Sequence, residues 1–218
     1  MSSSAFNWKE TGLLFERIEP LGMAGQRIVA AFCAHASGRF IEFCLQDCEY
    51  PEVPNLRKPL DLFVWKNLDQ PVISMPLGFE ELQEEMDDLW EGIDVHMRNS
   101  RNQVFGGAEF GEAFPVYAAS VRFFYGDGSL EALCRSIENF AWAKLEVLYK
   151  FAIGRKTWIK AEMKLPVMTQ VVADLDWIIS RIESIDSKES WDACVRDVRD
   201  YADICDSFSV RKVYYEPA

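Results

Sequence analysis

The chain has 218 residues, with 35 acidic and 23 basic side chains, and its formal net charge is −12. Apolar residues make up 49% of the chain and aromatic residues 13%, which is enough to form a hydrophobic core and excludes global disorder. Because sequence-independent binding to nucleic acid or to an anionic membrane needs a basic surface, the acidic balance argues against both. The length fits a single domain of residues 1–218, with residues 1–8 as a flexible tail.

Export and membrane insertion are not expected. The longest apolar run near the start, residues 28–34, has seven residues, whereas a helix needs about 20 to cross a bilayer. The first residues lack the basic start and the apolar run of a secretory signal. The six cysteines are most simply explained as buried thiols in a reducing compartment. We therefore predict a cytoplasmic protein.

The N-terminal third of the chain predicts β-structure. β-Branched and aromatic residues dominate the stretches 27–33 and 39–45. Residues 35–38, between them, have the length and the glycine of a hairpin turn. A loop with three prolines at 50–59 leads to a third predicted strand at 60–65.

Further along the chain, apolar residues recur every three or four positions, which is the period of an amphipathic helix. Ser129 is a suitable N-cap for one helix, and Asp186 with Glu189 resembles a capping box for the last. Strands first, helices later and no alternation of the two predict an α+β fold, in which N-terminal antiparallel strands form a sheet packed against about four amphipathic helices. The predicted helices are 79–97, 130–148, 168–185 and 191–205, and two further predicted strands are 115–125 and 210–215.

The negative charge is concentrated in two segments. Residues 78–98 contain eight acids and one base, and residues 172–208 contain ten acids and four bases. In the first segment the carboxylates recur opposite an apolar stripe, so one face of the predicted helix is strongly negative. Such a face attracts a basic protein and speeds its association. The predicted partner-binding residues are the carboxylates of this face and one adjacent aromatic anchor: Glu80, Glu84, Asp87, Asp88, Glu91 and Trp90.

These features together predict an acidic cytoplasmic binding protein. Its most concrete form is an inhibitor or immunity-type protein that neutralises a basic partner such as a nuclease toxin. One alternative is a carboxylate- or metal-dependent hydrolase, in which Asp87, Asp88 and Glu91 hold a divalent cation. Another is a structural or assembly subunit whose acidic faces only confer solubility.

Catalytic and cofactor chemistry has few candidates in this sequence. Nucleophilic catalysis with a histidine base would have to use His35 or His96, the two histidines of the chain. Zinc could in principle bind His35 together with Cys33, Cys44 and Cys48, but cysteines inside apolar runs favour core thiols. We therefore predict no catalytic residue, no metal and no cofactor.

Two glycine-rich stretches and one basic stretch complete the candidates. Residues 106–111 and 126–128 are predicted to be ordinary loops and turns rather than phosphate-binding loops. Residues 144–164 hold six bases against two acids and include Trp158. We expect these bases to pair with the acidic helices, the alternative being contact with a phosphate backbone or an acidic partner.

Overall fold

Helices form all the regular secondary structure that the structure describes. The computed structural model describes residues 13–47, 50, 53, 55–69, 88, 91, 107–126, 128–152 and 166–205, and these residues include no strand. The predicted α+β class is therefore wrong. In chain order, the elements are α1 Leu13–Ile18, the 3₁₀ turn η1 Glu19–Leu21, α2 Gly22–Asp47, α3 Arg57–Pro59, the π-helical turn η2 Leu60–Val64, α5 Gly107–Tyr125, α6 Leu130–Ala152, α8 Pro166–Glu183 and α9 Lys188–Ala202.

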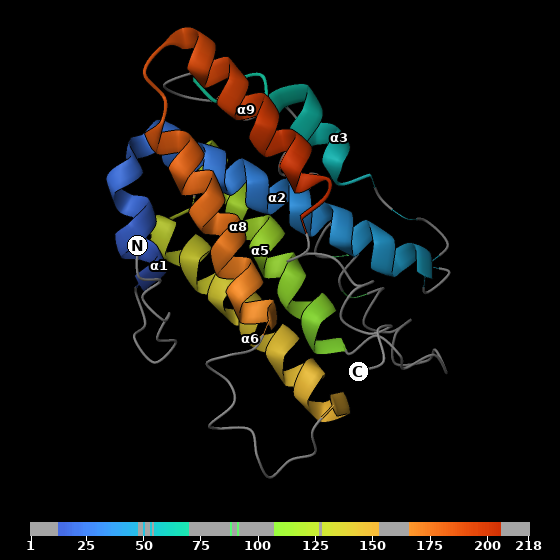
Figure 1. Cartoon of the computed structure of the whole chain (residues 1–218). Helices are drawn as coiled ribbons and strands as arrows, with labels where there is room; N and C mark the ends of the chain where they lie inside the picture. Colours follow the sequence, from blue (N-terminus) through green and yellow to red (C-terminus); the bar gives the residue numbers. More distant parts are fainter. Residues whose placement is uncertain are drawn as a thin grey trace.

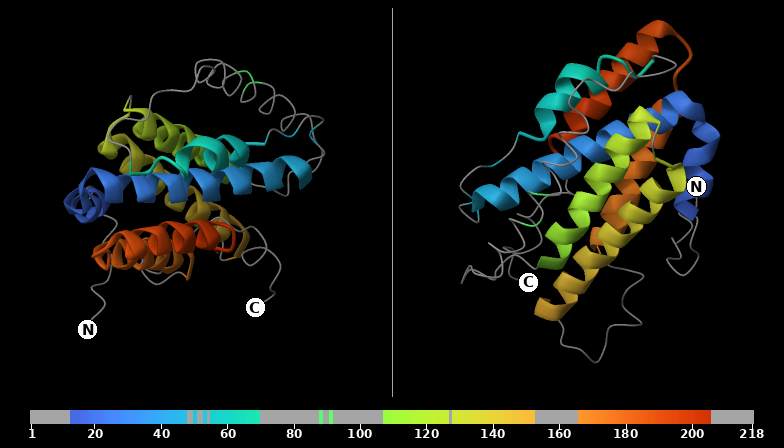
Figure 2. Two further views of the ribbon diagram at one scale, coloured as in Figure 1. Left: turned by 90° about the horizontal axis from the view of Figure 1, so that it is seen from above. Right: turned by 180° about the vertical axis from the view of Figure 1, so that it is seen from behind.

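The long helix α2 forms the centre of the described structure. It packs against α5, α8 and α9, and α6 packs against α5 and α8. Viewed from above, α2 crosses the molecule with α5 on one side and α9 on the other (Figure 2). The short elements α3 and η2 also pack on α2, beside α9 (Figure 1). Segments that lie far apart in the sequence, 57–64 and 188–202, thus cover one central helix.

The burial of α2 explains why its helical character is hard to recognise. Its residues 27–38 are all buried, so this stretch of the helix is covered on all sides and has no exposed polar face. A buried helix and a pair of buried strands cannot be distinguished by periodicity alone. The predicted strands 27–33 and 39–45 and the predicted turn 35–38 are therefore wrong, since all three lie within one continuous helix.

The same helix has the composition of a membrane span. The stretch Leu14–Gln46 has a mean hydropathy of 1.4 over its most apolar window, and 89% of that window is buried inside the protein. Length and composition alone would let it cross a bilayer, while burial at this level is also typical of a core helix. The cytoplasmic location remains a prediction.

Two other predicted strands are also helical. Residues 115–125 belong to α5, whose first residue, Gly107, also lies within the predicted loop at 106–111. The buried residues Ala113, Tyr117, Ser120 and Phe124 follow one another at helical spacing, although the local run of aromatic and β-branched residues favoured a strand. Residues 60–65 form η2 and the turn after it. The predicted strand at 210–215 lies outside the described residues.

The helices predicted in the second half of the chain are confirmed where the structure describes them. Ser129 caps α6 as predicted, because its Oγ accepts the backbone N–H of Ala132 at 3.1 Å. The capping box of α9 lies one residue later than predicted. Ser187 Oγ accepts the backbone N–H of Ser190 at 3.1 Å, and Ser190 Oγ accepts that of Ser187 at 2.9 Å.

Close helix contacts surround α2. A Cβ atom built on Gly25 would lie 2.9 Å from Cγ2 of Ile182, so the absence of a side chain there lets α2 approach α8. Phe40 of α2 meets Phe140 of α6 edge to face, with 5.7 Å between the ring centroids. Both rings are at most 2% exposed. These contacts fix the helices that hold the site described below.

The predicted core thiols are confirmed for the described cysteines. Cys33, Cys44, Cys134, Cys194 and Cys205 are buried thiols. Burial, followed by the charge of Glu138, raises the pKa of Cys134 to about 12. A thiol with so high a pKa is protonated and unreactive at neutral pH.

Candidate functional site

The structure describes two of the six predicted partner-binding residues. Asp88 and Glu91 are in helical conformation and exposed. Residues three apart on a helix share a face, so this pair agrees with the predicted helix and with its acidic side. Glu80, Glu84, Asp87 and Trp90 lie outside the described residues.

A second acidic surface lies where α8 leads into α9. The carboxylates of Glu183, Asp186 and Glu189 are exposed. Among the described residues, no cationic side chain forms an ion pair with any of these three. We refer to Glu183, Asp186 and Glu189 as the hairpin acids.

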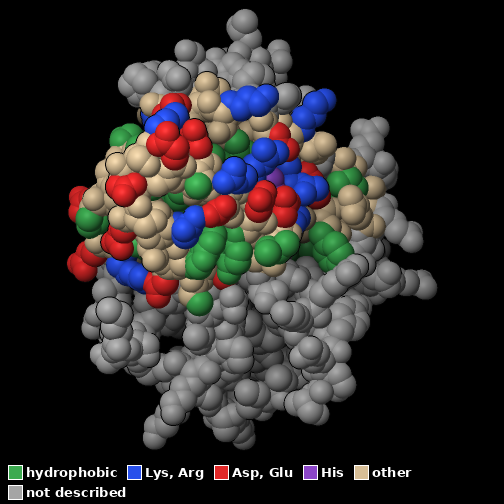
Figure 3. Space-filling model, turned by 45° about the horizontal axis from the view of Figure 1, so that its top comes forward, with side chains coloured by type: hydrophobic (Ala, Val, Ile, Leu, Met, Phe, Trp, Pro, Cys, Tyr) green, Lys and Arg blue, Asp and Glu red, His purple; other side chains and the backbone are tan. Residues whose placement is uncertain are grey.

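Most other acids of this region are neutralised by bases. Lys188 lies 3.2 Å from Asp192 and 3.4 Å from Asp69, and Arg199 lies 2.9 Å from Asp61. Acidic and basic side chains consequently alternate over α9 and the neighbouring segment 57–69 (Figure 3). Exposed pairs of this kind contribute little to stability, roughly 0–1 kcal/mol each, but they reduce the local negative charge.

The densest polar cluster surrounds His35, in the middle of α2. The imidazole is 3% exposed, its Nε2 lies 3.0 Å from Oδ1 of Asp203, and its Nδ1 lies 3.3 Å from Nε1 of Trp65. Asp203 follows the last residue of α9, and Trp65 follows the last residue of η2. One buried side chain of α2 therefore contacts both segments that cover this helix.

Arg57 extends the cluster towards the surface. Its Nε donates to Oε2 of Glu42 at 2.9 Å, its backbone N–H donates to Oε1 of Glu42 at 3.2 Å, and its Nη1 lies 3.3 Å from Oδ1 of Asp203. Glu42 is buried, with a side chain 8% exposed, whereas that of Arg57 is 38% exposed. Arg39 completes the cluster by donating from Nη2 to the carbonyl of Cys205 at 2.9 Å. We refer to His35, Arg39, Glu42, Arg57 and Asp203 as the clasp.

The pKa of the Asp203 carboxyl is lowered in the clasp. Burial alone would raise its pKa, but the hydrogen bond from His35, the charge that this ring carries when it is protonated, and the charges of Arg57 and Arg39 outweigh burial. The folded protein therefore binds a proton at Asp203 less readily than the unfolded chain. This carboxylate contributes stability above the ordinary carboxyl pKa, and the contribution is lost as the pH falls below that value.

Replacing Asp203 by asparagine is expected to reduce stability at pH 7 and to have less effect near pH 3. Asparagine keeps an oxygen that can accept from His35 but removes the charge that Arg57 and Arg39 stabilise. The measurement is the free energy of unfolding in denaturant as a function of pH. The matched control is Asp200→Asn, an exposed acid of the same helix that is in no ion pair among the described residues. Equal pH dependence of the two variants would contradict the prediction.

Comparison with protein-family models, with curated proteins and with solved structures found no match. The function must therefore be argued from the residues themselves.

The clasp is not arranged as a catalytic site. Both ring nitrogens of His35 are engaged and the ring is buried, so His35 cannot act as a base towards a substrate without rearrangement.

The zinc site considered from the sequence is not formed by the described residues, among which no group of three or more possible ligands meets. Cys33 and Cys44 lie on one buried helix. Cys48 and His96 lie outside the described residues.

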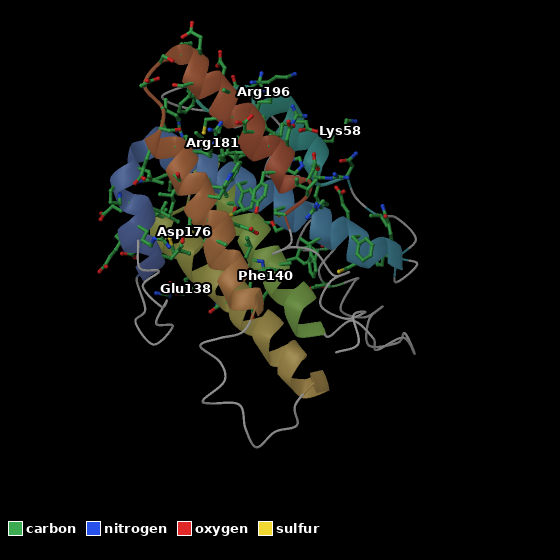
Figure 4. The ribbon with its side chains drawn as sticks, in the orientation of Figure 1. Lys58, Glu138, Phe140, Asp176, Arg181 and Arg196 are labelled. Carbon is green, nitrogen blue, oxygen red and sulfur yellow. The ribbon has the colours of Figure 1, made fainter. Side chains whose placement is uncertain are left out.

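The two predictions made for the basic stretch 144–164, internal pairing or contact with a partner, stay predictions, since the structure describes no side chain in it. Elsewhere, Arg196 of α9 and Lys58 of α3 are exposed bases on the upper side of the molecule (Figure 4). Sequence reasoning missed the clasp. Its members come from three separate parts of the chain, namely α2, α3 and the residue after α9. His35, Arg39 and Glu42 recur at helical spacing, but this pattern has meaning only once the segment is known to be a helix.

Proposed function

We propose that this protein is an acidic binding protein that neutralises a basic protein partner, such as a nuclease toxin. The observation that supports this proposal is the presence of exposed carboxylates that form no ion pair among the described residues, in a chain of net charge −12. Asp88 and Glu91 supply two of them and the hairpin acids three more. Uncompensated charge of one sign accelerates the encounter with a partner of opposite sign.

The contrast with the rest of α9 strengthens this interpretation. Where α9 meets segment 57–69, the acids are paired with bases: Asp69 with Lys188, Asp61 with Arg199 and Asp203 with Arg57. The hairpin acids lie in the same region of the chain but make no such pair within the described structure. In the proposed mechanism, these free carboxylates and those of the 79–97 segment occupy the basic groups with which a nuclease would bind phosphate.

The test begins with recovery of the partner. A tagged protein is used to capture proteins from the native host's lysate at about 0.05 M and about 0.5 M salt, because salt screens steering between exposed charges. We expect a stoichiometric basic protein whose binding weakens at the higher salt. Recovery of no basic protein, or of one that is insensitive to salt, would contradict the proposal.

The second step measures association rates with the recovered protein. Asp88→Lys with Glu91→Lys is expected to lower the association rate constant by about tenfold or more at low salt and much less at high salt. The control is Glu16→Lys with Glu131→Lys, which changes the net charge equally through two exposed acids of α1 and α6. A variant carrying lysine at the three hairpin acids shows which acidic segment the partner meets. Equal rates for the control and both variants would overturn the proposed docking surface.

A further inference from the structure

His35 connects two segments that are otherwise joined to each other mainly at the surface. Segment 57–69 and the end of α9 are linked by the pairs Asp61–Arg199, Asp69–Lys188 and Arg57–Asp203, whose side chains are 38–64% exposed. Screened pairs of this kind hold weakly. By contrast, the indole of Trp65 is 6% exposed and reaches the buried ring of His35, which it meets edge-on with 5.9 Å between the centroids.

The hydrogen bonds of His35 define its protonation state in this structure. A tryptophan indole nitrogen can only donate, so the 3.3 Å contact requires a lone pair on Nδ1 of His35. The proton of the neutral ring must then be on Nε2, from which it is donated to Asp203 at 3.0 Å. The observed arrangement is that of a neutral imidazole.

Protonation changes the two sides of this ring in opposite ways. An imidazolium carries a proton on both nitrogens, so Nδ1–H would face the N–H of Trp65 and the bond between them would be lost. On the other side, the bond to the Asp203 carboxylate becomes charge-assisted and shorter. Histidine is the side chain that ordinarily changes charge between pH 5 and 8. We infer that His35 is a proton-operated switch that, on protonation, releases the indole of Trp65 while retaining the end of α9.

The charges around the ring do not prevent this change. Besides Asp203, which contacts the ring, the paired charged groups of the surrounding elements come from α9, from α3, from η2 and from α2 itself. Acids and bases are equal in number among them, and Asp203 favours the cation. The charged groups are Asp203 and Arg199, Arg57, Asp61, and Glu42 with Arg39.

The local backbone is suited to such a release. Trp65 donates its backbone N–H to the carbonyl of Leu60 at 3.0 Å, which closes the π-turn η2. Turns of this type are short and are frequent at functional sites. Losing the bond from the Trp65 side chain leaves a buried donor without a partner, which is unfavourable unless the indole moves towards water.

The test follows Trp65 and His35 together by nuclear magnetic resonance. In the full-length ¹⁵N-labelled protein, the indole N–H signal of Trp65 and the ring signals of His35 are assigned and followed from pH 8 to pH 5. We expect the neutral ring to show the tautomer protonated on Nε2 at the upper end. We expect the Trp65 signal to change with the same midpoint as the ring. A Trp65 signal that stays constant while the ring titrates would overturn the proposal, as would a ring that stays neutral until the protein unfolds.

Two variants move the midpoint in opposite directions. Trp65→Phe removes the donor that favours the neutral ring, so the ring midpoint is expected to rise by roughly half a pH unit to one unit. Asp203→Asn removes the charge that favours the cation, so the midpoints of His35 and Trp65 are expected to fall together. Asp200→Asn should leave both unchanged. If Trp65→Phe does not fold, the joint shift in Asp203→Asn decides the matter, and separate shifts of the two signals in that variant would contradict the switch.

Discussion

Replacing Phe140 by alanine is expected to lower the free energy of unfolding by about 3–5 kcal/mol. The ring is fully buried on α6 and meets Phe40 of α2, so its removal opens a cavity where these two helices approach each other. Such a cavity forfeits both the transfer free energy of the ring and its contacts with surrounding atoms. The measurement is denaturant unfolding followed by circular dichroism.

A neighbouring residue of the same helix gives the control for this prediction. Asn139 is exposed. Alanine at that position should change stability by less than about 0.5 kcal/mol, as is usual for surface substitutions. If Phe140→Ala cost no more than Asn139→Ala, the burial of Phe140 against Phe40 would be incorrect.

The amphipathic helices could be predicted from the sequence because one of their faces meets water. In α8 the buried residues Leu175, Ile178 and Ile182 alternate with exposed ones at helical spacing. The same holds for α9, where Cys194 and Val198 are buried and Arg196 and Asp200 are exposed. Because the exposed positions carry polar residues, the helical period is visible in these sequences, and these helices were predicted correctly.

The central helices could not be predicted in this way. In α2 a run such as Ile28–Ala34 is buried on every side, so no polar residue marks the turns of the helix. Its alanines at positions 30, 31 and 34 favour helix, but the valine, isoleucine and phenylalanine beside them favour a strand, and they led to the prediction of a strand. In α5 the tertiary environment likewise overrides the strand preference of Val121, Phe123 and Phe124.

The candidate site also has a part that the sequence could predict and a part that it could not. Charge is a property that can be counted, and the count located the two acidic segments to which Asp88, Glu91 and the hairpin acids belong. The clasp depends on three-dimensional contacts between residues up to 168 positions apart, such as His35 and Asp203. The sequence predicts a turn at His35, which places the residue at the surface, and nothing local indicates that Asp203 and Trp65 meet its buried ring.

Replacing Glu42 by alanine is expected to cost about 2–3 kcal/mol of unfolding free energy. The carboxylate is buried and accepts from both the side chain and the backbone N–H of Arg57, so its removal leaves two donors without their acceptor. Since the guanidinium of Arg57 is 38% exposed, water can hydrate part of it, and the cost stays below that of breaking a fully buried pair.

A double-mutant cycle separates the pair from its surroundings. Arg57→Ala alone should also destabilise the protein, because it leaves the Glu42 carboxylate buried with one fewer donor. Once Glu42 is alanine, the further loss of the Arg57 side chain should cost less, and the coupling energy should be about 1 kcal/mol or more. Glu42→Gln, which keeps one acceptor and the shape of the side chain, should lose less than Glu42→Ala. Additive effects of the two alanine substitutions would mean that Glu42 and Arg57 act independently, and that α3 is held on α2 by its apolar contacts rather than by the clasp.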